Sequence, residues 1–366
     1  MLNVNKISDL AKSMADKDIN ALFVGPSSDL QYLTGLSPFA DERFKALVVL
    51  ADGRHFYICP ALYLEETKKE IGEDIKIYVW DDSSGFLNAL KEVNKDFDIE
   101  GKRIAVNEGI RAIDLLDIKQ LIPAEYVKAC ELLGRLRIIK DETEQENMRK
   151  AAEIIDEAVV DLTKFIRPGM TEKDVKDRLE DFCLERGSSF SFPPIIASGP
   201  NSSMPHYNDY SRRIQEKDIV ILDIGCVYNG YCSDTTRTVF VGEPTEEQKK
   251  VYNVVLEANK QAEQFVREGV KASDIDKKAR SVIEDAGYGE YFVHRTGHGI
   301  GVAVHEEPYI MQSNDMVIEE GMAFSIEPGI YLPGKFGVRI EDIVIAKKDG
   351  AEVLNKSPKD DIIIIK

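Results

Sequence analysis

The chain has 366 residues, of which 43% are hydrophobic and 31% charged, a composition typical of a folded protein of about two domains. Its 47 Lys and Arg against 65 Asp and Glu give a net charge of −18, which argues against binding to the phosphate backbone of nucleic acids. No apolar run resembles a signal peptide or reaches the ~20 residues that cross a membrane. The five cysteines are scattered and form no CxxC pair. These features predict a cytoplasmic protein with neither a nucleic-acid nor a membrane partner.

Residues 1–132 contain expected strands that alternate with expected helices. Strands are predicted at 21–25, 75–80 and 103–107, a hairpin over 45–59 with its turn at Asp52-Gly53, and helices over 60–72 and 111–121. This alternation indicates an α/β domain with a mixed sheet covered by helices. No ligand cluster appears in it, so we expect this domain to act as a lid or an oligomerisation surface.

The domain boundary is expected at 132/133, which gives a second domain over 133–366. A long helix is predicted to begin near Asp141 or Thr143. Either residue could cap it, and Glu144 and Glu146 would place negative charge in its first turn.

The second domain contains an internal repeat. FIRPGMTEKDV begins at Phe165, and FVREGVKASDI begins 100 residues later at Phe265. Two pairs of glycines keep this offset, Gly169 with Gly269 and Gly187 with Gly287. Each copy predicts two helices followed by a β-hairpin, so the domain should have pseudo-two-fold ααββ symmetry.

Each predicted hairpin carries two acids. An apolar strand ends at Asp223 or Glu327, and the following strand carries Asp234 or Glu341. The pseudo-two-fold axis would bring the four carboxylates to one central site. An acid in an apolar strand is costly if it is buried without a partner. These acids therefore either face solvent, pair with basic residues, or bind cations.

Three of the five histidines lie in HRTGHGIGVAVHE, residues 294–306. His298 stands between two glycines, where the backbone can pass close to a bulky group. His305 follows the apolar run 300–304, which predicts a buried strand, and lies 99 residues after His206. A glycine-kinked core strand with packed histidines is the alternative.

Four carboxylates and one imidazole suit two divalent cations. Oxygen-rich ligation with a single nitrogen favours Mn²⁺ first, with Co²⁺, Zn²⁺ or Fe²⁺ as alternatives. Such paired ions activate water, so the pattern is typical of a hydrolase.

Four segments together resemble the pita-bread metallopeptidases, and within them the Xaa-Pro peptidases aminopeptidase P and prolidase. They are FPPIIASGPNSSMPH at 192–206, LDIGCVYNGYCSDTTRT at 222–238, HRTGHGIGVAVHE at 294–306 and SIEPGIYLPGKFGVRIED at 325–342. The resemblance implies an α+β fold in which a creatinase/prolidase-like α/β domain precedes a pita-bread catalytic domain. It also implies a dinuclear peptidase, commonly a homodimer, that cleaves after the first residue of peptides with proline at the second position.

The resemblance assigns a metal role to five residues. Asp223 would bind one metal, Asp234 and Glu341 would bridge both, and His298 and Glu327 would complete the second. Glu327 is also the family's candidate proton shuttle.

Four more residues are expected around these ligands. The resemblance implies that His206 and His305 contact the scissile carbonyl or the developing oxyanion. His294 would line the substrate pocket or pack in the core. Arg339 would orient ligands or form a salt bridge without a catalytic role.

One position departs from the family pattern. Several dipeptidases of the family bind the substrate carboxylate through an arginine in the loop after the second histidine, where this chain has Tyr309. Tyr309 is expected to contact the substrate and can donate a hydrogen bond, but it brings no charge, which favours an aminopeptidase for longer peptides over a strict dipeptidase. Arg295 or an arginine of a partner subunit could supply the charge instead.

Three other functions share the fold. A methionine aminopeptidase would have the same ligands but usually lacks such an N-terminal domain. A creatinase-like amidinohydrolase works without metal and lacks the ligand set. A non-catalytic binding module would have lost ligands, whereas all five are present here.

Overall fold

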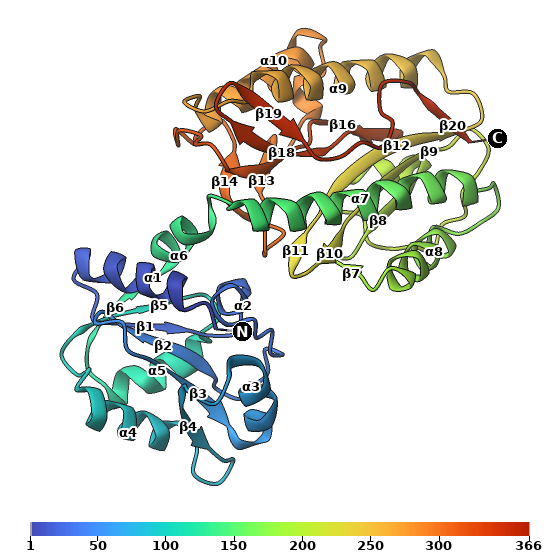
Figure 1. Cartoon of the computed structure of the whole chain (residues 1–366). Helices are drawn as coiled ribbons and strands as arrows, with labels where there is room; N and C mark the ends of the chain where they lie inside the picture. Colours follow the sequence, from blue (N-terminus) through green and yellow to red (C-terminus); the bar gives the residue numbers. More distant parts are fainter. Residues whose placement is uncertain (1, 366) are drawn as a thin grey trace. The chain divides into compact units, whose positions relative to one another are not determined.

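The computed structural model describes residues 2–365, which form two compact units divided between Arg137 and Ile138 (Figure 1). Helix α6 (Cys130–Arg137) ends the first unit, and the boundary expected at 132/133 falls within this helix. No helix among the described residues is long and apolar enough to cross a membrane.

The first unit is built on a six-stranded mixed sheet in the order β4-β3-β2-β1-β5-β6. Its strands are β1 (Ala21–Val24), β2 (Ala46–Leu50), β3 (His55–Pro60), β4 (Lys76–Trp80), β5 (Arg103–Val106) and β6 (Glu125–Lys128). The other helices are α1 (Val4–Asp16), α2 (Ser28–Thr34), α3 (Leu64–Ile71), α4 (Phe86–Phe97) and α5 (Ala112–Leu121). One core packs α1, α2, α3 and α6 on the sheet, and a second core packs α4 and α5. The expected α/β domain is confirmed, with β2 and β3 as the predicted hairpin.

The second unit begins with the first of two matching helix pairs. They are α7 (Glu142–Phe165) with α8 (Glu172–Glu185), and α9 (Glu246–Phe265) with α10 (Ala272–Asp285). Asp141 caps α7 in a reciprocal capping box with Glu144, so the helix begins at the first of the two expected positions. Gly169 and Gly269 turn the chain between the helices of each pair with φ of +91° and +86°, a conformation that favours glycine.

Two sheets follow the same repeat. The first contains β8 (Ile195–Ser198), β9 (Ile219–Ile224), β12 (Thr235–Val241) and β20 (Ile363–Ile365). The second contains β13 (Gly297–Gly299), β14 (Glu306–Ile310), β15 (Ala323–Ile326), β18 (Asp342–Lys347) and β19 (Gly350–Val353). One core joins α7 and α8 to the first sheet, and another joins α9 and α10 to the second. In Figure 1 the two helix pairs accordingly lie on different sides of the strands.

Shorter strands complete the unit. They are β7 (Ser189–Phe190), β10 (Cys226–Tyr228), β11 (Tyr231–Cys232), β16 (Gly329–Leu332) and β17 (Phe336–Arg339). A bridge between Thr236 and Glu341 joins the strand-rich segments of the two halves. The predicted pita-bread arrangement of two ααββ halves is confirmed.

The strand predicted over 300–304 is wrong. These residues form the connection between β13 and β14, which pair antiparallel with Gly299 opposite Glu306. The run is apolar because Ile300 packs in the core, while Val302 to Val304 are half-buried in the connection. Apolar composition alone does not separate a short strand from a packed loop.

Candidate metal centre

Strand pairing brings the four acids together. Asp223 is the penultimate residue of β9, and Asp234 directly precedes β12, which pairs with β9 so that Asp223 lies opposite Thr236. Glu327 directly follows β15, and Glu341 directly precedes β18, which pairs with β15. The two hairpins are equivalent in the repeat, and the bridge between Thr236 and Glu341 places them side by side.

Glycines allow His298 to approach these acids. A Cβ atom on Gly297 would lie 1.8 Å from the Ser325 carbonyl oxygen, and one on Gly299 would lie 2.2 Å from the Glu307 carbonyl oxygen. Only glycine therefore permits β13 to pack this closely between β14 and β15. The tight packing holds the imidazole of His298 at the carboxylates.

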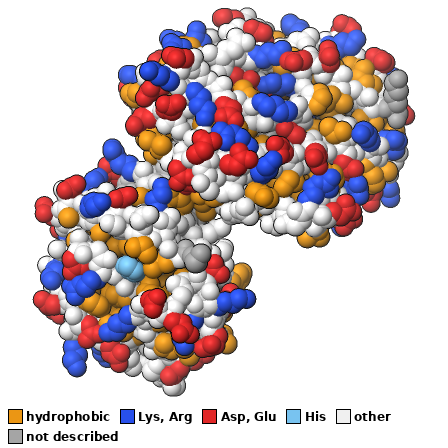
Figure 2. Space-filling model, in the orientation of Figure 1, with side chains coloured by type: hydrophobic (Ala, Val, Ile, Leu, Met, Phe, Trp, Pro, Cys, Tyr) orange, Lys and Arg blue, Asp and Glu red, His pale blue; other side chains and the backbone are white. Residues whose placement is uncertain are grey.

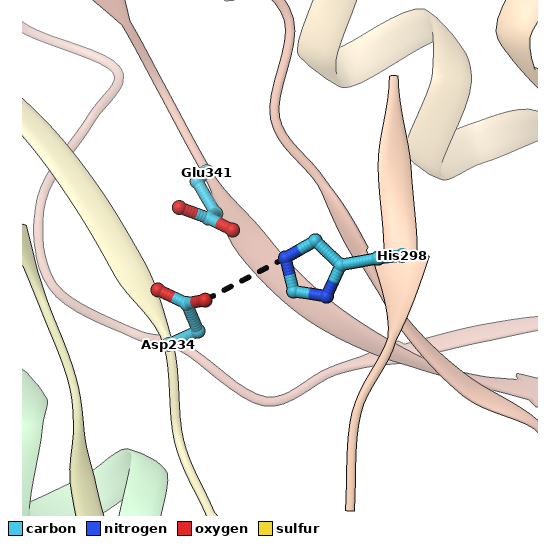
Figure 3. A group of neighbouring side chains, drawn as sticks. All are labelled: Asp234, His298 and Glu341. Carbon is cyan, nitrogen blue, oxygen red and sulfur yellow. Dashed lines mark ion pairs between the residues drawn. The ribbon is translucent and has the colours of Figure 1, made fainter. Parts of the chain in front are cut away.

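His298 Nε2 lies 3.3 Å from Glu327 Oε1 and 3.7 Å from Asp234 Oδ2. Asp234, His298 and Glu341 each offer one ligand atom, and these atoms lie within 4.8 Å of one another. Figure 3 shows the three side chains pointing toward one another from different strand segments, with the ion pair between Asp234 and His298 dashed.

The cluster has unused ligand atoms. Asp234 Oδ1 and Glu341 Oε1 are buried and have no hydrogen-bond partner among residues 2–365. The other Glu341 oxygen accepts from Thr236 Oγ1 at 2.7 Å. Buried polar atoms are normally paired, so two orphaned carboxylate oxygens beside an imidazole nitrogen fit a divalent cation. The residues present therefore suit a divalent cation.

Asp223 lies at the end of the cluster nearest Arg339. Its Oδ2 accepts from Arg339 Nη2 at 2.5 Å. Arg339 also donates from Nη1 to the Tyr331 hydroxyl at 2.7 Å and from Nε to Thr236 Oγ1 at 3.1 Å. The guanidinium thus orients one candidate ligand directly and a second, Glu341, through Thr236.

Burial and mutual repulsion favour the neutral forms of Asp234, Glu327 and Glu341, and burial favours the neutral form of His298. Burial raises the pKa of the Asp234 and Glu341 carboxyls well above their usual range, and the neighbouring carboxylates raise both further. Burial also raises the pKa of Glu327 to about 7, against the opposing effect of Arg339. Burial lowers the pKa of the His298 imidazole to about 3, with a further effect from His305. A bound cation favours ionised carboxylates, so it would oppose these upward shifts.

The raised pKa of Glu327 predicts that the stability of the metal-free protein depends on pH. The pKa of Glu327 is raised from 4.5 to about 7, so the unfolded chain releases this proton at lower pH than the folded chain does. Below about pH 4.5 the Glu327 carboxyl is protonated in both the folded and the unfolded chain, so its ionisation does not affect the free energy of unfolding. As the pH rises to about 7, ionisation of this carboxyl lowers the free energy of unfolding progressively. We expect Glu327→Gln to increase the free energy of unfolding relative to wild type, and the difference to widen across this window.

The difference between the two proteins reports the loss of the Glu327 carboxyl together with the loss of its repulsion of Asp234 and Glu341. The histidines act in the opposite direction, because burial lowers the pKa of His294 and His298 and their stability contribution grows with pH. Urea unfolding in chelator at several pH values measures the difference. The exposed Glu320→Gln serves as the matched control and should give a flat difference. A difference for Glu327→Gln that is flat or narrows with pH would contradict this assignment of the pKa.

All five candidate ligands line one cavity of about 610 Å³ in the second unit. The cavity is also lined by eight side chains that could contact a substrate: Phe192, Ile195, His206, Tyr207, His294, Arg295, His305 and Arg339. Of the residues expected around the ligands and the substrate, His294 and Arg339 line the cavity and Tyr309 does not. Tyr309 lies behind Arg295, whose guanidinium carbon is 4.5 Å from the centre of the tyrosine ring.

The three histidines occupy distinct positions. The ring of His305 lies 4.3 Å from that of His298 and nearly perpendicular to it. Burial lowers the pKa of His305, with further effects from Arg295 and His206. Nε2 of His294 forms a hydrogen bond of 2.9 Å with the Tyr331 hydroxyl. Burial lowers the pKa of His294 to about 4. Imidazoles with lowered pKa values are neutral at pH 7.

Sequence reasoning missed Tyr331 and Thr236. Both connect Arg339 to the site, since the Tyr331 hydroxyl lies between His294 and Arg339, and Thr236 lies between Arg339 and Glu341. Thr236 stands in the segment CSDTTRT, two residues after Asp234, so strand alternation could have placed both on one face. Tyr331 had no such signal, because its position depends on the pairing of β16 with β17.

Two pseudo-symmetric ααββ halves around a buried carboxylate and imidazole cluster define a metal-dependent hydrolase of the pita-bread class. Residues 146–348 match the model of metallopeptidase family M24, and residues 6–139 match the creatinase/prolidase N-terminal domain. The chain belongs to metallopeptidase family M24.

Similar proteins agree with this membership. The probable dipeptidase PepE of Mycobacterium tuberculosis is 40% identical over 97% of this chain and 94% of that protein. The prolidase of Thermococcus sibiricus is 38% identical, with a TM-score of 0.95 over 100% of this chain and 99% of that chain. The X-Pro aminopeptidase of Thermotoga maritima is 32% identical, with a TM-score of 0.88 over 98% of this chain and 99% of that chain.

Proposed function

We propose that this metallopeptidase hydrolyses the Xaa-Pro bond with two divalent cations, Mn²⁺ first and Co²⁺, Zn²⁺ or Fe²⁺ as alternatives. Asp223, Asp234, His298, Glu327 and Glu341 would hold the cations. The observation that carries the proposal is the pair of orphaned carboxylate oxygens beside His298, on the wall of a cavity that also contains His206 and His305. The similarity to a prolidase and to an X-Pro aminopeptidase supports proline at the second position.

The side chains around the cluster have separate tasks in this reaction. Bound divalent cations supply Lewis-acid polarisation of the scissile carbonyl and activation of water. Glu327 lies 3.3 Å from His298 in the same cluster, and its carboxylate would take a proton from the attacking water and pass it to the leaving nitrogen. His206 and His305 line the cavity and would donate to the carbonyl oxygen as negative charge develops. Arg339 keeps Asp223 oriented.

The positive charge of Arg295 on the cavity wall favours short substrates, whose free carboxylate can reach it. Arg295 lines the cavity, and its guanidinium has no hydrogen-bond or ion-pair partner among residues 2–365. The Tyr309 ring supports it from behind. A free guanidinium suits the carboxylate of an Xaa-Pro dipeptide. Xaa-Pro dipeptides are therefore the proposed substrate. The replacement of a family arginine by Tyr309 favours longer Xaa-Pro peptides and keeps aminopeptidase action as the second candidate.

The role of Arg295 predicts a change in substrate preference. Arg295→Gln is expected to raise KM for Leu-Pro by roughly 10–100-fold, because a hydrogen bond to a charged group contributes about 1.5–3 kcal/mol. KM for Leu-Pro amide, which lacks the carboxylate, should stay unchanged. Steady-state kinetics on both substrates measures this difference, with Arg267→Gln on an exposed turn as the control. Equal losses on the two substrates would contradict carboxylate recognition by Arg295.

A cleavage panel tests the proposed function. Protein stripped of metal by a chelator should cleave nothing, and addition of Mn²⁺ should restore cleavage of Leu-Pro but not of Leu-Ala. Preferred cleavage of Met-Ala-Ser would identify a methionine aminopeptidase instead. Loss of activity in the chelator, restored by Mn²⁺ or Co²⁺, would exclude a metal-independent amidinohydrolase. Failure to bind metal or to cleave any peptide would support the non-catalytic alternative.

The setting of the enzyme belongs to the same proposal. Five free cysteines, four of them buried, support a cytoplasmic location. The net charge of −18 supports the absence of a nucleic-acid partner, and basic side chains are interspersed with acidic ones on the face shown in Figure 2. The N-terminal domain would act as a lid or a dimer surface, and light scattering tests the homodimer.

A further inference from the structure

A largely buried polar network lies outside the cavity, next to the candidate ligands of the second half. Its members are Arg237, Asn259, Glu263, Asp342 and Lys359, and we call it the Lys359 network. Lys359 Nζ contacts Asp342 Oδ2 at 2.5 Å, Asn259 Oδ1 at 2.6 Å and Glu263 Oε1 at 2.7 Å. The side chain of Asp342 is 0% exposed and that of Lys359 is 14% exposed. The lysine thus joins the C-terminal segment to helix α9 and strand β18.

One arm of the network holds Glu341. Neighbouring residues on a strand face opposite sides, so Asp342 points away from the side to which Glu341 points. Asp342 Oδ1 accepts from Arg237 Nη2 at 2.6 Å, and Arg237 Nη1 donates to the Glu341 carbonyl oxygen at 2.7 Å. Arg237 also donates to the Ser357 carbonyl oxygen. The backbone of Glu341 is therefore fixed by a side chain from the other half.

A second arm holds Glu327. Asn259 on α9 donates from Nδ2 to the carbonyl oxygen of Ile326 at 2.9 Å, and Ile326 directly precedes Glu327. The Oδ1 atom of the Asn259 amide accepts a hydrogen bond from Lys359 Nζ. This contact orients the amide so that its Nδ2 group points to the Ile326 carbonyl oxygen. Lys359 is thus linked through Asn259 to the peptide group that joins Ile326 to Glu327. Through Asp342 and Arg237 it is linked to the backbone carbonyl of Glu341.

We propose that Lys359 is a positioning residue of the metal centre, which holds Glu327 and Glu341 at the spacing that divalent cations require. Replacing a buried ion pair with apolar side chains is often neutral for stability, so stability alone does not account for the fully buried pair of Arg237 and Asp342 and the partly buried pair of Lys359 and Glu263. Groups behind metal ligands typically change metal affinity by about 10–100-fold when they are removed. The proposal rests on the ligand set in the proposed function.

Lys359→Met tests the proposal through metal affinity. We expect the dissociation constant for Mn²⁺, measured on folded protein by competition with a fluorescent chelator, to rise by roughly 10–100-fold. Lys359→Arg should restore most of the affinity. Lys260→Met removes an exposed ion pair between the same helix and Asp360 and should leave the constant unchanged. Val175→Ala destabilises the core of the same unit away from the network and should also leave it unchanged.

Asn259→Leu provides an independent variant if Lys359→Met does not fold. It keeps the shape of the side chain but removes the donor to Ile326, so it should weaken Mn²⁺ binding as well. An unchanged dissociation constant in either folded variant would overturn the proposal. Absence of Mn²⁺ binding in the wild-type protein would instead overturn the ligand assignment, so the two failures are distinguishable.

Discussion

Asp234→Asn is expected to lower kcat/KM on Leu-Pro by roughly 10³-fold or more, which corresponds to about 4 kcal/mol of transition-state stabilisation. The substitution removes a carboxylate of the proposed ligand set, and His298 and Glu341 cannot replace it because each offers its own ligand atom to the same cluster. The same change should raise the stability of the metal-free protein. Burial and the charges of Glu341, Asp223 and Glu327 raise the pKa of Asp234, so its removal relieves a cost of folding.

These opposite effects separate a ligand from a residue that only supports the fold. A structural aspartate would lower activity and stability together. Steady-state kinetics at saturating Mn²⁺ and thermal unfolding in chelator measure the two effects. Asp349→Asn, on an exposed turn before β19, is the control and should change neither. Retention of full activity by Asp234→Asn with metal present would show that the site has been assigned incorrectly.

The second large effect is expected for His305→Ala, which should lower kcat by roughly 10²–10³-fold and leave Mn²⁺ affinity unchanged. His305 lines the cavity 4.3 Å from the ring of His298. Its pKa is lowered by burial, Arg295 and His206, so the imidazole is neutral at pH 7 and can donate a hydrogen bond to a developing oxyanion. The loss should therefore appear in the chemical step.

Separate measurements of kcat, KM and Mn²⁺ affinity test this role. His206→Ala should have an effect of similar size, and the double variant should lose less than the product of the two single losses if both act on one oxygen. His55→Ala on β3 of the first unit is the control. A rise in KM with unchanged kcat would place His305 in ground-state binding instead.

The fold of the second unit was predictable because its internal repeat is visible in the sequence. Gly169 and Gly269 mark equivalent turns, and the turns frame equivalent helices of similar length. The acids Asp223 and Glu327 recur at equivalent strand ends for the same reason. Local patterns of this kind reflect backbone conformation and burial, which act within a few residues.

The contacts between the halves were not predictable in the same way. The Lys359 network joins Arg237, Asn259 and Lys359, which are at least 22 residues apart in sequence, and its members carry no shared motif. The position of Tyr331 beside Arg339 depends on hairpin register, which a single sequence does not reveal. The run 300–304 was misassigned because burial of a loop resembles burial of a strand.

The most direct test of the central claim is the anomalous difference density of a crystal grown with Mn²⁺. The proposed site predicts two peaks among Asp223, Asp234, His298, Glu327 and Glu341, with Asp234 and Glu341 contacting both. The same experiment on Asp234→Asn should reduce or remove the peaks. Mn²⁺ bound elsewhere, or no ion within ligand distance of His298 at saturating metal, would contradict the account.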